Sequence, residues 1–198
     1  MKLHPGTPLI PIDMQRGFDL PSWGRRNNPA LDANGRRLLA AWRAAGWPVL
    51  HVRHDSVQPG STLRPGHPGH AFRPGFEPLP GEPVVAKTVN CAFVGTDLDL
   101  RLRRMDARGA VFLGFTTDMC VSTTVRIAAN LGIRAVLVAD ACACFGLPGE
   151  GGAILPAEAI HDAHVATLRA EFAEVVSTDG AIEALRGAAD GTQPASAS

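Results

Sequence analysis

The chain has 198 residues, with 19 Lys plus Arg against 19 Asp plus Glu, and its apolar content of 45% is typical of a soluble globular protein. The balanced charge argues against a nucleic-acid partner, and no apolar run reaches the roughly 18 to 20 residues that a membrane helix needs. We see no signal-peptide pattern and no CxxC among the four cysteines, so we expect a cytoplasmic chain with reduced thiols.

The first elements alternate between strand and helix. Residues 7–12 form a short apolar run that predicts a strand ending at Asp13. Apolar residues with helical spacing at 29–45 predict a helix, which Gly46 ends. A second strand is expected at 48–54.

A long connection follows the second strand. Residues 55–83 are crowded with Pro and Gly, so we expect no packed element there. Loops of this length are uncommon unless they are functional or disordered. A short strand is expected next, at residues 84–87.

The second half of the chain continues the alternation. Residues 97–107 predict a helix, 110–114 a buried strand, 119–131 a helix and 134–139 another buried strand. The remaining elements are expected as helix, strand and helix at 156–172, 174–177 and 180–186.

This order predicts one α/β domain. Strands that alternate with helices indicate a parallel sheet covered on both faces, and continuous apolar strands fit burial on both sides. We find no internal repeat and no second composition regime, and assign residues 1–186 to a single domain. Residues 187–198 are small and polar, and we expect a flexible C-terminal tail.

Chemically useful side chains follow the strands where they end. Asp13, His54 and Lys87 end the first three strands, Cys120 lies in the segment after the fourth, and Asp140 follows the fifth. Parallel sheets of this type bind ligands at the carboxyl ends of their strands. We therefore expect an acid, a base and a thiol to meet at one edge.

Cys120 is the candidate nucleophile. It is predicted at the start of a helix, where partial positive charge and free N–H groups favour a thiolate, and Lys87 nearby would lower the thiol pKa further. Asp13 could take the thiol proton and later return it to a leaving amine. Each residue alone also has a structural interpretation, because Cys is often buried and Asp and Lys often end elements.

Three segments carry a resemblance to a known family. Residues 9–15 (LIPIDMQ), Lys87 with residues 90–93 (NCAF), and residues 114–121 (GFTTDMCV) resemble, in order and spacing, the isochorismatase-like cysteine hydrolases, a group that includes nicotinamidases and N-carbamoylsarcosine amidases. The likeness covers roughly residues 7–178.

The resemblance implies a fold and an activity. The fold is a three-layer αβα sandwich, Rossmann-like, with a mainly parallel sheet of roughly six strands. The activity is hydrolysis of a small-molecule amide or carbamoyl C–N bond through a thioester, with Asp13, Lys87 and Cys120 as the catalytic residues. A cis peptide between Phe115 and Thr116 is implied, with the N–H groups of Thr116 and Cys120 forming an oxyanion hole. Homo-oligomers, either dimers or tetramers, are common in the family.

Other positions are candidate walls of a substrate pocket. These are Phe18, Trp23, His54, Phe93 and Thr117. For Phe18 and Phe93 simple core packing is the alternative, and for His54 pocket and core remain open. Cys91 stands where the family often has Ser, so it is either a core residue or a second thiol near the site.

We expect no metal and no cofactor. Nicotinamidases bind a metal through an Asp-x-His pair and a later His, whereas His54 precedes Asp55 in the matching region here. His67 and His70 have a spacing that could bind zinc on a helix, but they lie among Pro and Gly and are expected to be solvated. The expected partner is therefore a small-molecule substrate alone.

Two alternatives remain open. One is an isochorismatase-type vinyl ether hydrolase, which does not need the thiol, and the other is a catalytically idle binding or scaffold protein. A nucleotide-binding domain would need a Gly-rich loop after the first strand, and residues 13–17 do not form one.

Overall fold

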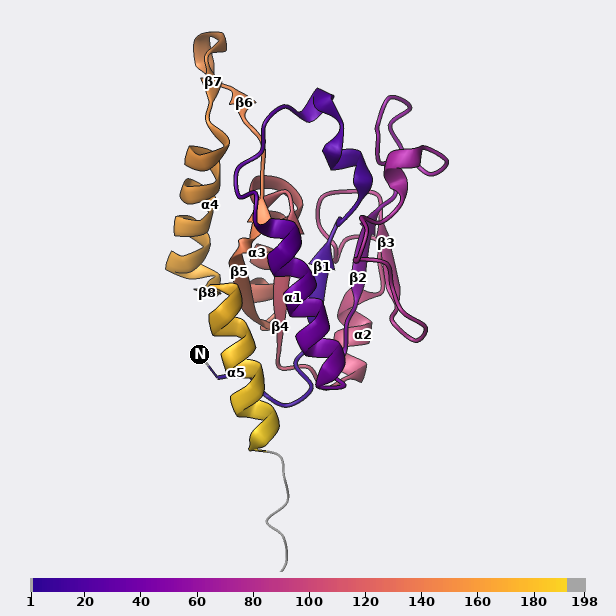
Figure 1. Cartoon of the computed structure of the whole chain (residues 1–198), viewed down its shortest axis with the longest axis vertical. Coiled ribbons are helices and arrows are strands. Elements are labelled where there is room, and N and C mark those ends of the chain that lie inside the picture. The colour runs from indigo at the N-terminus through magenta and orange to yellow at the C-terminus, as the bar shows by residue number, and fades with distance from the viewer. Residues whose placement is uncertain (1, 192–198) are drawn as a thin grey trace, which may run out of the picture.

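A computed structural model of the chain describes residues 2–191. Its centre is a sheet of six parallel strands in the order β3-β2-β1-β4-β5-β8 (Figure 1). The strands are β1 (Leu9–Ile12), β2 (His51–His54), β3 (Val84–Lys87), β4 (Gly109–Phe115), β5 (Arg134–Ala143) and β8 (Ala173–Val176). The expected α/β fold with a six-stranded parallel sheet is confirmed.

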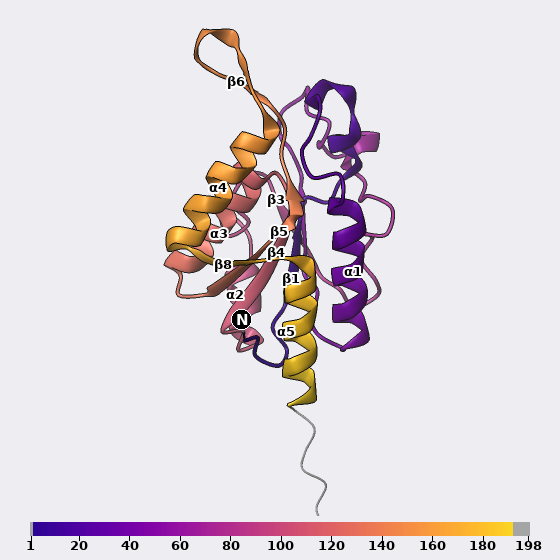
Figure 2. The same ribbon diagram turned by 60° about the vertical axis from the view of Figure 1, so that its left-hand side comes forward.

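Helices cover both faces of this sheet. One face carries α1 (Leu31–Ala44) and α5 (Thr178–Asp190), and the other carries α2 (Leu98–Arg104), α3 (Ser122–Asn130) and α4 (Ala157–Glu171) (Figure 2). Single turns complete the chain: 3-10 turns at η1 (Arg16–Asp19), η2 (Pro21–Trp23), η3 (Pro68–His70) and η5 (Glu150–Gly152), and a π turn at η4 (Thr117–Val121).

The sheet order creates a crevice beside β1. The strand that follows β1 in the chain is β2, on one side of it in the sheet. On the other side of β1 lies β4, and the strand that follows β4 is β5, one position further from β1. Because right-handed crossovers then run over opposite faces, the segments that follow β1 and β4 diverge at their carboxyl ends. Ligands bind at such switch points in open α/β sheets.

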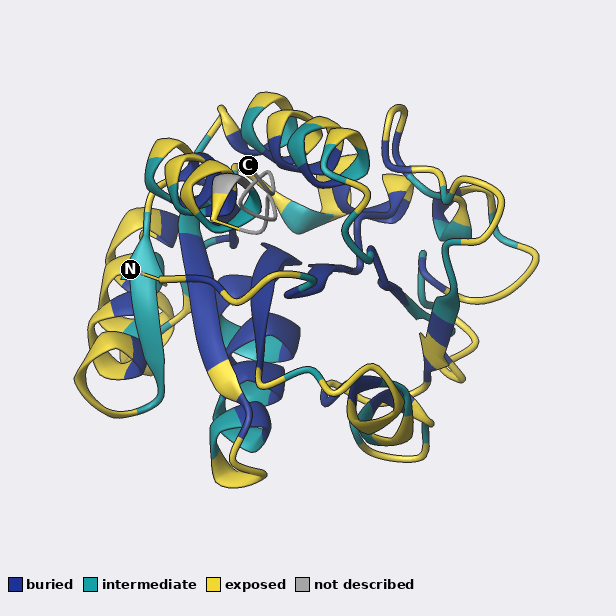
Figure 3. Cartoon of the chain, turned by 90° about the horizontal axis from the view of Figure 1, so that it is seen from below, coloured by how far each residue is buried: buried dark blue, intermediate teal, exposed yellow. Residues whose placement is uncertain are grey.

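The core lies on both sides of the central strands. All residues of β1 and β4 are buried. In Figure 3 the strands in the middle of the molecule are mostly dark blue, whereas the helices around them are yellow on their outer sides. The inward face of α1 supplies Leu31, Leu38, Leu39 and Trp42, whose spacing is that of one helix face. Continuous apolar strands and one-sided helices are therefore what this layered packing requires.

The hairpin of β6 (Leu147–Pro148) and β7 (Ile154–Leu155) was not expected from the sequence. It projects from the body of the protein ahead of α4 in Figures 1 and 2. Strands of two residues are too short to show an alternating pattern, so they carry no periodic signal in the sequence.

The long connection at 55–83 is held against the body by buried side chains. Phe76 is fully buried, and Arg73 is bound by carboxylate oxygens of Asp32 and Asp19 at 2.7 Å. The connection includes the turn η3, whereas the sequence predicted no packed element there. Sparse anchors of this kind do not produce the periodicity by which an element is recognised.

The C-terminal helix extends beyond the expected domain limit. Helix α5 continues to Asp190, so the boundary expected after residue 186 falls within it. Residues 192–198 of the expected tail lie outside the described residues. Within residues 2–191, none of the helices combines the length and the apolarity of a membrane span.

Candidate active site

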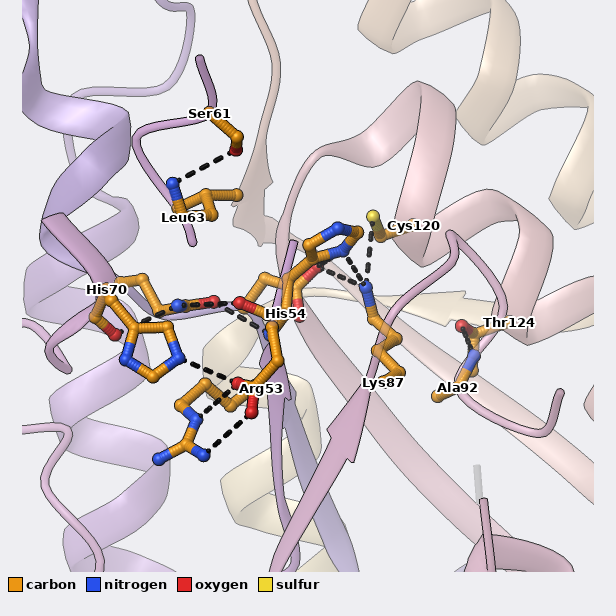
Figure 4. Close-up of polar contacts among 12 residues, drawn as sticks. Arg53, His54, Ser61, Leu63, His70, Lys87, Ala92, Cys120 and Thr124 are labelled. Atoms are coloured by element: carbon orange, nitrogen blue, oxygen red, sulfur yellow. Dashed lines mark hydrogen bonds and ion pairs between the residues drawn. The ribbon is translucent and has the colours of Figure 1, made fainter. Parts of the chain in front are cut away.

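The side chain of Lys87 contacts residues at or after the ends of three other strands, β1, β2 and β4. From the end of β3, its Nζ lies 2.7 Å from Asp13 Oδ2, 2.9 Å from His54 Nδ1 and 3.3 Å from Cys120 Sγ (Figure 4). The side chains of Lys87 and Asp13 are both fully buried. The structure thus brings together the acid, the amine and the thiol that the sequence predicted to meet.

Asp13 keeps one carboxylate oxygen unused. The residue follows β1 directly, has a φ of 51°, and its N–H is bound to the Val52 carbonyl at 2.9 Å. Oδ1 is buried and has no hydrogen-bond partner among the described residues. A carboxylate oxygen accepts hydrogen bonds readily, so this atom can receive a proton inside the site.

Cys120 lies in η4, the turn that leads into α3. Burial, and then the negative charge of Asp13, raise the pKa of this thiol, while Lys87 lowers it. The prediction of a low thiol pKa in the free protein was therefore wrong, although the direction of the Lys87 effect was right. The sequence could not weigh burial against the neighbouring charges, because both depend on the tertiary structure.

The charges of the site favour transfer of the thiol proton to Asp13 over its loss to solvent. Burial alone would lower the pKa of Lys87, but Asp13 and then Cys120 outweigh it and raise that pKa, so the amine stays an ammonium. Moving the thiol proton to Asp13 leaves the net charge of the three groups unchanged. Such a transfer avoids the cost of adding a charge to a buried site, a cost that loss of the proton to solvent would carry.

The segment between β4 and the nucleophile adopts an unusual backbone. The peptide between Phe115 and Thr116 is cis, as predicted. The Thr116 carbonyl accepts from the N–H groups of Met119 and Val121 at 3.2 and 3.1 Å, which closes the turn that carries Cys120. Thr116 and Cys120, the predicted oxyanion-hole residues, therefore lie on one compact turn.

Gly114 is required for this backbone path. Its φ is 125°, in the region that residues with a side chain rarely adopt, and a Cβ there would lie 2.0 Å from the Ile12 carbonyl oxygen. Only glycine allows β1 and β4 to stay this close where they reach the site.

Two of the candidate pocket residues lie in an aromatic cluster. Phe18 stacks on Phe115 with ring centroids 4.8 Å apart, and Trp23 lies 4.9 Å from Phe18. Trp23 is half-buried and lines a cavity of about 230 Å³ together with Thr116 and Phe145. Phe93, like Trp23, is half-buried and packs against the main core.

Thr117 has a hydrogen-bond partner on α4. It is fully buried, and its Oγ1 lies 2.9 Å from Nδ1 of His161 on α4. Burial lowers the pKa of His161, so its ring is neutral. The sequence placed Thr117 at the site by its position in the motif, but it gave no indication that α4 supplies a partner for its hydroxyl.

Gln15 is a site residue to which the sequence assigned no role. It is fully buried, and its side chain accepts from the N–H of His54 at 2.9 Å and donates to the His54 carbonyl at 3.1 Å. It also donates to the carbonyl of His70 at 2.9 Å. The only indication in the sequence that Gln15 belongs to the site was its position two residues after Asp13.

The metal-ligating groups near the site are already engaged. Among the described residues, Asp13, His54 and Cys120 form the one group of three whose ligand atoms lie within 4.8 Å of one another. The Lys87 ammonium donates a hydrogen bond to each of these three side chains. A cation placed among them would face this buried ammonium, so these residues do not fit a metal site.

The remaining histidines of the loop have structural partners. His67 Nδ1 accepts from the Gly69 N–H at 2.9 Å, and His70 Nε2 lies 2.7 Å from Asp55 Oδ1. Asp140, expected at the same sheet edge, instead accepts from the N–H and hydroxyl of Thr178, the first residue of α5, at 2.8 Å.

Comparison with known proteins gives consistent matches along the chain. The isochorismatase domain model matches residues 7–180. The isochorismatase family protein YrdC of Bacillus subtilis, itself uncharacterized, is 39% identical over 171 residues, which are 86% of this chain and 91% of that protein. The ureidoacrylate amidohydrolase RutB of Pseudomonas syringae pv. syringae is 28% identical over 177 residues, covering 71% of this chain and 72% of that protein.

A solved structure shares the whole architecture. The crystal structure of an isochorismatase family protein from Chromobacterium violaceum matches with a TM-score of 0.91 and 42% sequence identity. The match covers 94% of this chain and 97% of that one. The similarity therefore extends over the sheet, the covering helices and the segments that carry the site.

Proposed function

This chain belongs to the isochorismatase family of hydrolases, and from that membership we propose that it is a cysteine-dependent amidase acting on a small molecule. It cleaves an amide or carbamoyl C–N bond and releases ammonia or an amine. The observation that carries this proposal is the buried Lys87 ammonium within hydrogen-bond distance of both the Asp13 carboxylate and the Cys120 thiol. A relative named as an amidohydrolase supports the same class of bond.

The reaction begins with the proton of Cys120. Asp13 takes this proton on its unpaired Oδ1, which leaves a thiolate beside Lys87 and a neutral carboxylic acid. The thiolate attacks the carbonyl carbon of the amide and forms a C–S bond. The negative charge moves to the carbonyl oxygen, which the backbone N–H groups of Thr116 and Cys120 stabilise.

The tetrahedral intermediate then loses its nitrogen. Asp13 donates its proton to that nitrogen as the C–N bond breaks, so the leaving group departs as neutral ammonia or amine. The products of this half-reaction are the free amine, a thioester on Cys120 and an ionised Asp13.

Water completes the cycle. Asp13 takes a proton from a water molecule as its oxygen attacks the thioester, and the C–S bond breaks to release a carboxylic acid. Asp13 returns the proton to the thiolate of Cys120, which restores the starting state. Lys87 keeps its proton throughout and supplies a fixed positive charge.

The proposed walls of the substrate pocket are the aromatic rings of Phe18 and Trp23, with His54 and Phe93. Of these, Trp23 also lines the cavity of about 230 Å³, which none of Asp13, Lys87 and Cys120 lines. We propose no cofactor for this chemistry, and a dimer or tetramer remains a prediction that light scattering during size-exclusion chromatography tests.

The proposal is tested by ammonia release from a panel of small amides, carbamoyl compounds and ureides, measured with a chelator present. We expect turnover by the wild type, none by Cys120→Ser, and an acyl adduct on the Cys120 peptide in acid-quenched samples. Cys91→Ser is the matched control, because it removes another buried thiol and should keep activity.

Two results would overturn the proposal. Ammonia release by Cys120→Ser would exclude this thiol as the nucleophile. Cleavage of a vinyl ether such as isochorismate, with no release of ammonia or amine from any member of the panel, would favour the ether hydrolase alternative.

A further inference from the structure

The imidazole of His54 has a defined tautomer. An ammonium carries three N–H donors and no acceptor, and those of Lys87 are directed to Asp13 Oδ2, Cys120 Sγ and His54 Nδ1. Nδ1 of His54 must therefore be without a proton. In a neutral ring the proton is then on Nε2.

The position of this ring is also fixed. Gln15 binds both the N–H and the carbonyl of His54, at 2.9 and 3.1 Å, and is itself fully buried. Burial, and then the positive charge of Lys87, lower the pKa of His54, so the ring remains neutral near pH 7. His54 thus presents a fixed neutral donor.

The Nε2–H group has no acceptor in the part of the chain that the structure describes. Within residues 2–191 no hydrogen bond links this atom to another residue, while the side chain keeps 13% of its surface exposed. In Figure 4 the ring lies beside the Cys120 sulfur, with Nδ1 joined to Lys87. A half-buried donor next to the nucleophile is satisfied when a bound molecule supplies an acceptor.

The strand order shows which part of a substrate reaches His54. His54 ends β2, and the Cys120 turn follows β4, so the backbone segments that carry them lie on opposite sides of the end of β1, while the two side chains come within 4.8 Å of each other beside Asp13. In the proposed reaction the carbonyl oxygen faces the turn and the leaving nitrogen faces Asp13. The third substituent of the carbonyl carbon, which is the rest of the acyl group, is then directed towards β2.

We propose that the Nε2–H of His54 donates a hydrogen bond to a second oxygen in the acyl group, next to the scissile carbonyl, so that the enzyme prefers amides that carry such an oxygen. This inference rests on the proposed amidase function. The substrate class it names is the 2-oxo amides and amides with a comparable adjacent carbonyl.

The test uses two amides of nearly the same shape. Pyruvamide has a carbonyl oxygen where isobutyramide has a methyl group. The 2-oxo group also makes the amide carbonyl more reactive in every variant, so the change in the ratio of the two kcat/KM values between the wild type and a His54 variant reports the hydrogen bond. His54→Asn keeps an acceptor for Lys87 near the Nδ1 position but removes the outer donor, whereas His54→Gln places an amide donor near the Nε2 position. We expect the wild-type preference for pyruvamide to fall about tenfold in His54→Asn and to be largely kept in His54→Gln.

A second measurement does not need turnover. Nitrogen-15 NMR of the full chain, with the His54 signals assigned by their loss in His54→Asn, should give an unprotonated Nδ1 and a protonated Nε2 at neutral pH. In Cys120→Ala, pyruvamide should shift the Nε2 signal and isobutyramide should not.

The two hypotheses fail in different ways. An unchanged kcat/KM ratio in His54→Asn, or a proton on Nδ1, would overturn the role of His54 and leave the amidase intact. A pyruvamide-specific shift of Nε2 in a protein that releases no ammonia from any amide would support the role of His54 and overturn the amidase.

Discussion

Replacement of Lys87 by Met removes the positive charge of the site and leaves the buried Asp13 carboxylate without a paired cation. The side chains of both residues are fully buried, and they are joined at 2.7 Å. The complementary change is Asp13→Asn, which keeps the shape of the side chain and suits a φ of 51°, because Asn tolerates the left-handed region. The two single variants and the double variant form a thermodynamic cycle.

The size of each effect follows from burial. Removing one partner of a buried ion pair costs about 3 to 5 kcal/mol, because an unpaired charge is left in a poorly solvated site. Lys87→Met should lie in this range. Asp13→Asn should lie near its lower end, because the ammonium still has His54 and Cys120 as acceptors. The double variant holds no buried charge and should be less destabilised than the sum of the single variants by at least about 3 kcal/mol.

Urea unfolding followed by tryptophan fluorescence measures these free energies, and ammonia release is measured in parallel. A domain of this size is stable by about 5 to 15 kcal/mol, so a loss of about 3 to 5 kcal/mol leaves the single variants folded when the wild type lies above the lower end of that range, which its own urea curve measures. None of the three variants should turn over substrate. Effects that add within about 0.5 kcal/mol would show that the two charges do not compensate each other, and our account of the site would be wrong.

Three further changes test other parts of the structure. Gly114→Ala should destabilise the protein by about 3 kcal/mol or more, because a Cβ at this position of positive φ would clash with the backbone of β1. The midpoint of urea unfolding should fall, and a midpoint near that of the wild type would refute the clash. Asp13→Asn should move the thiolate absorbance of Cys120 to lower pH, because the Asp13 charge raises this pKa, and an upward shift would contradict that cause. Burial, the largest single cause, would raise the pKa of Glu82, but the hydrogen bonds from Arg43, the Leu79 N–H and His51, together with the charge of Arg43, outweigh it and lower the pKa to about 2. The stability that this depressed pKa contributes is fully present above pH 4.5, the ordinary pKa of Glu, and is lost as the pH falls towards about 2. Glu82→Gln should therefore flatten the dependence of Tm on pH between these values. An unchanged slope would contradict the role given to Glu82.

The sequence determined the fold class and the identity of the three central residues. The strand at residues 84–87 agrees with β3 at both ends, and the helix expected at 156–172 differs from α4 by one residue at each end. These elements were predictable because burial on one or both faces imposes a local repeat of apolar residues. Asp13, Lys87 and Cys120 were predictable because parallel strands bring their carboxyl ends to one edge.

Only the tertiary structure decided how these residues are protonated and what else contacts them. The pKa of Cys120 depends on burial and on two charges that are distant in the sequence, and local reasoning at the helix start gave the wrong direction. The contacts of Gln15 with His54 and of Thr117 with His161 join residues 39 and 44 positions apart. A local repeat of apolar residues does not predict such contacts, because each side chain contacts its partner only when the sheet and its covering helices have assembled.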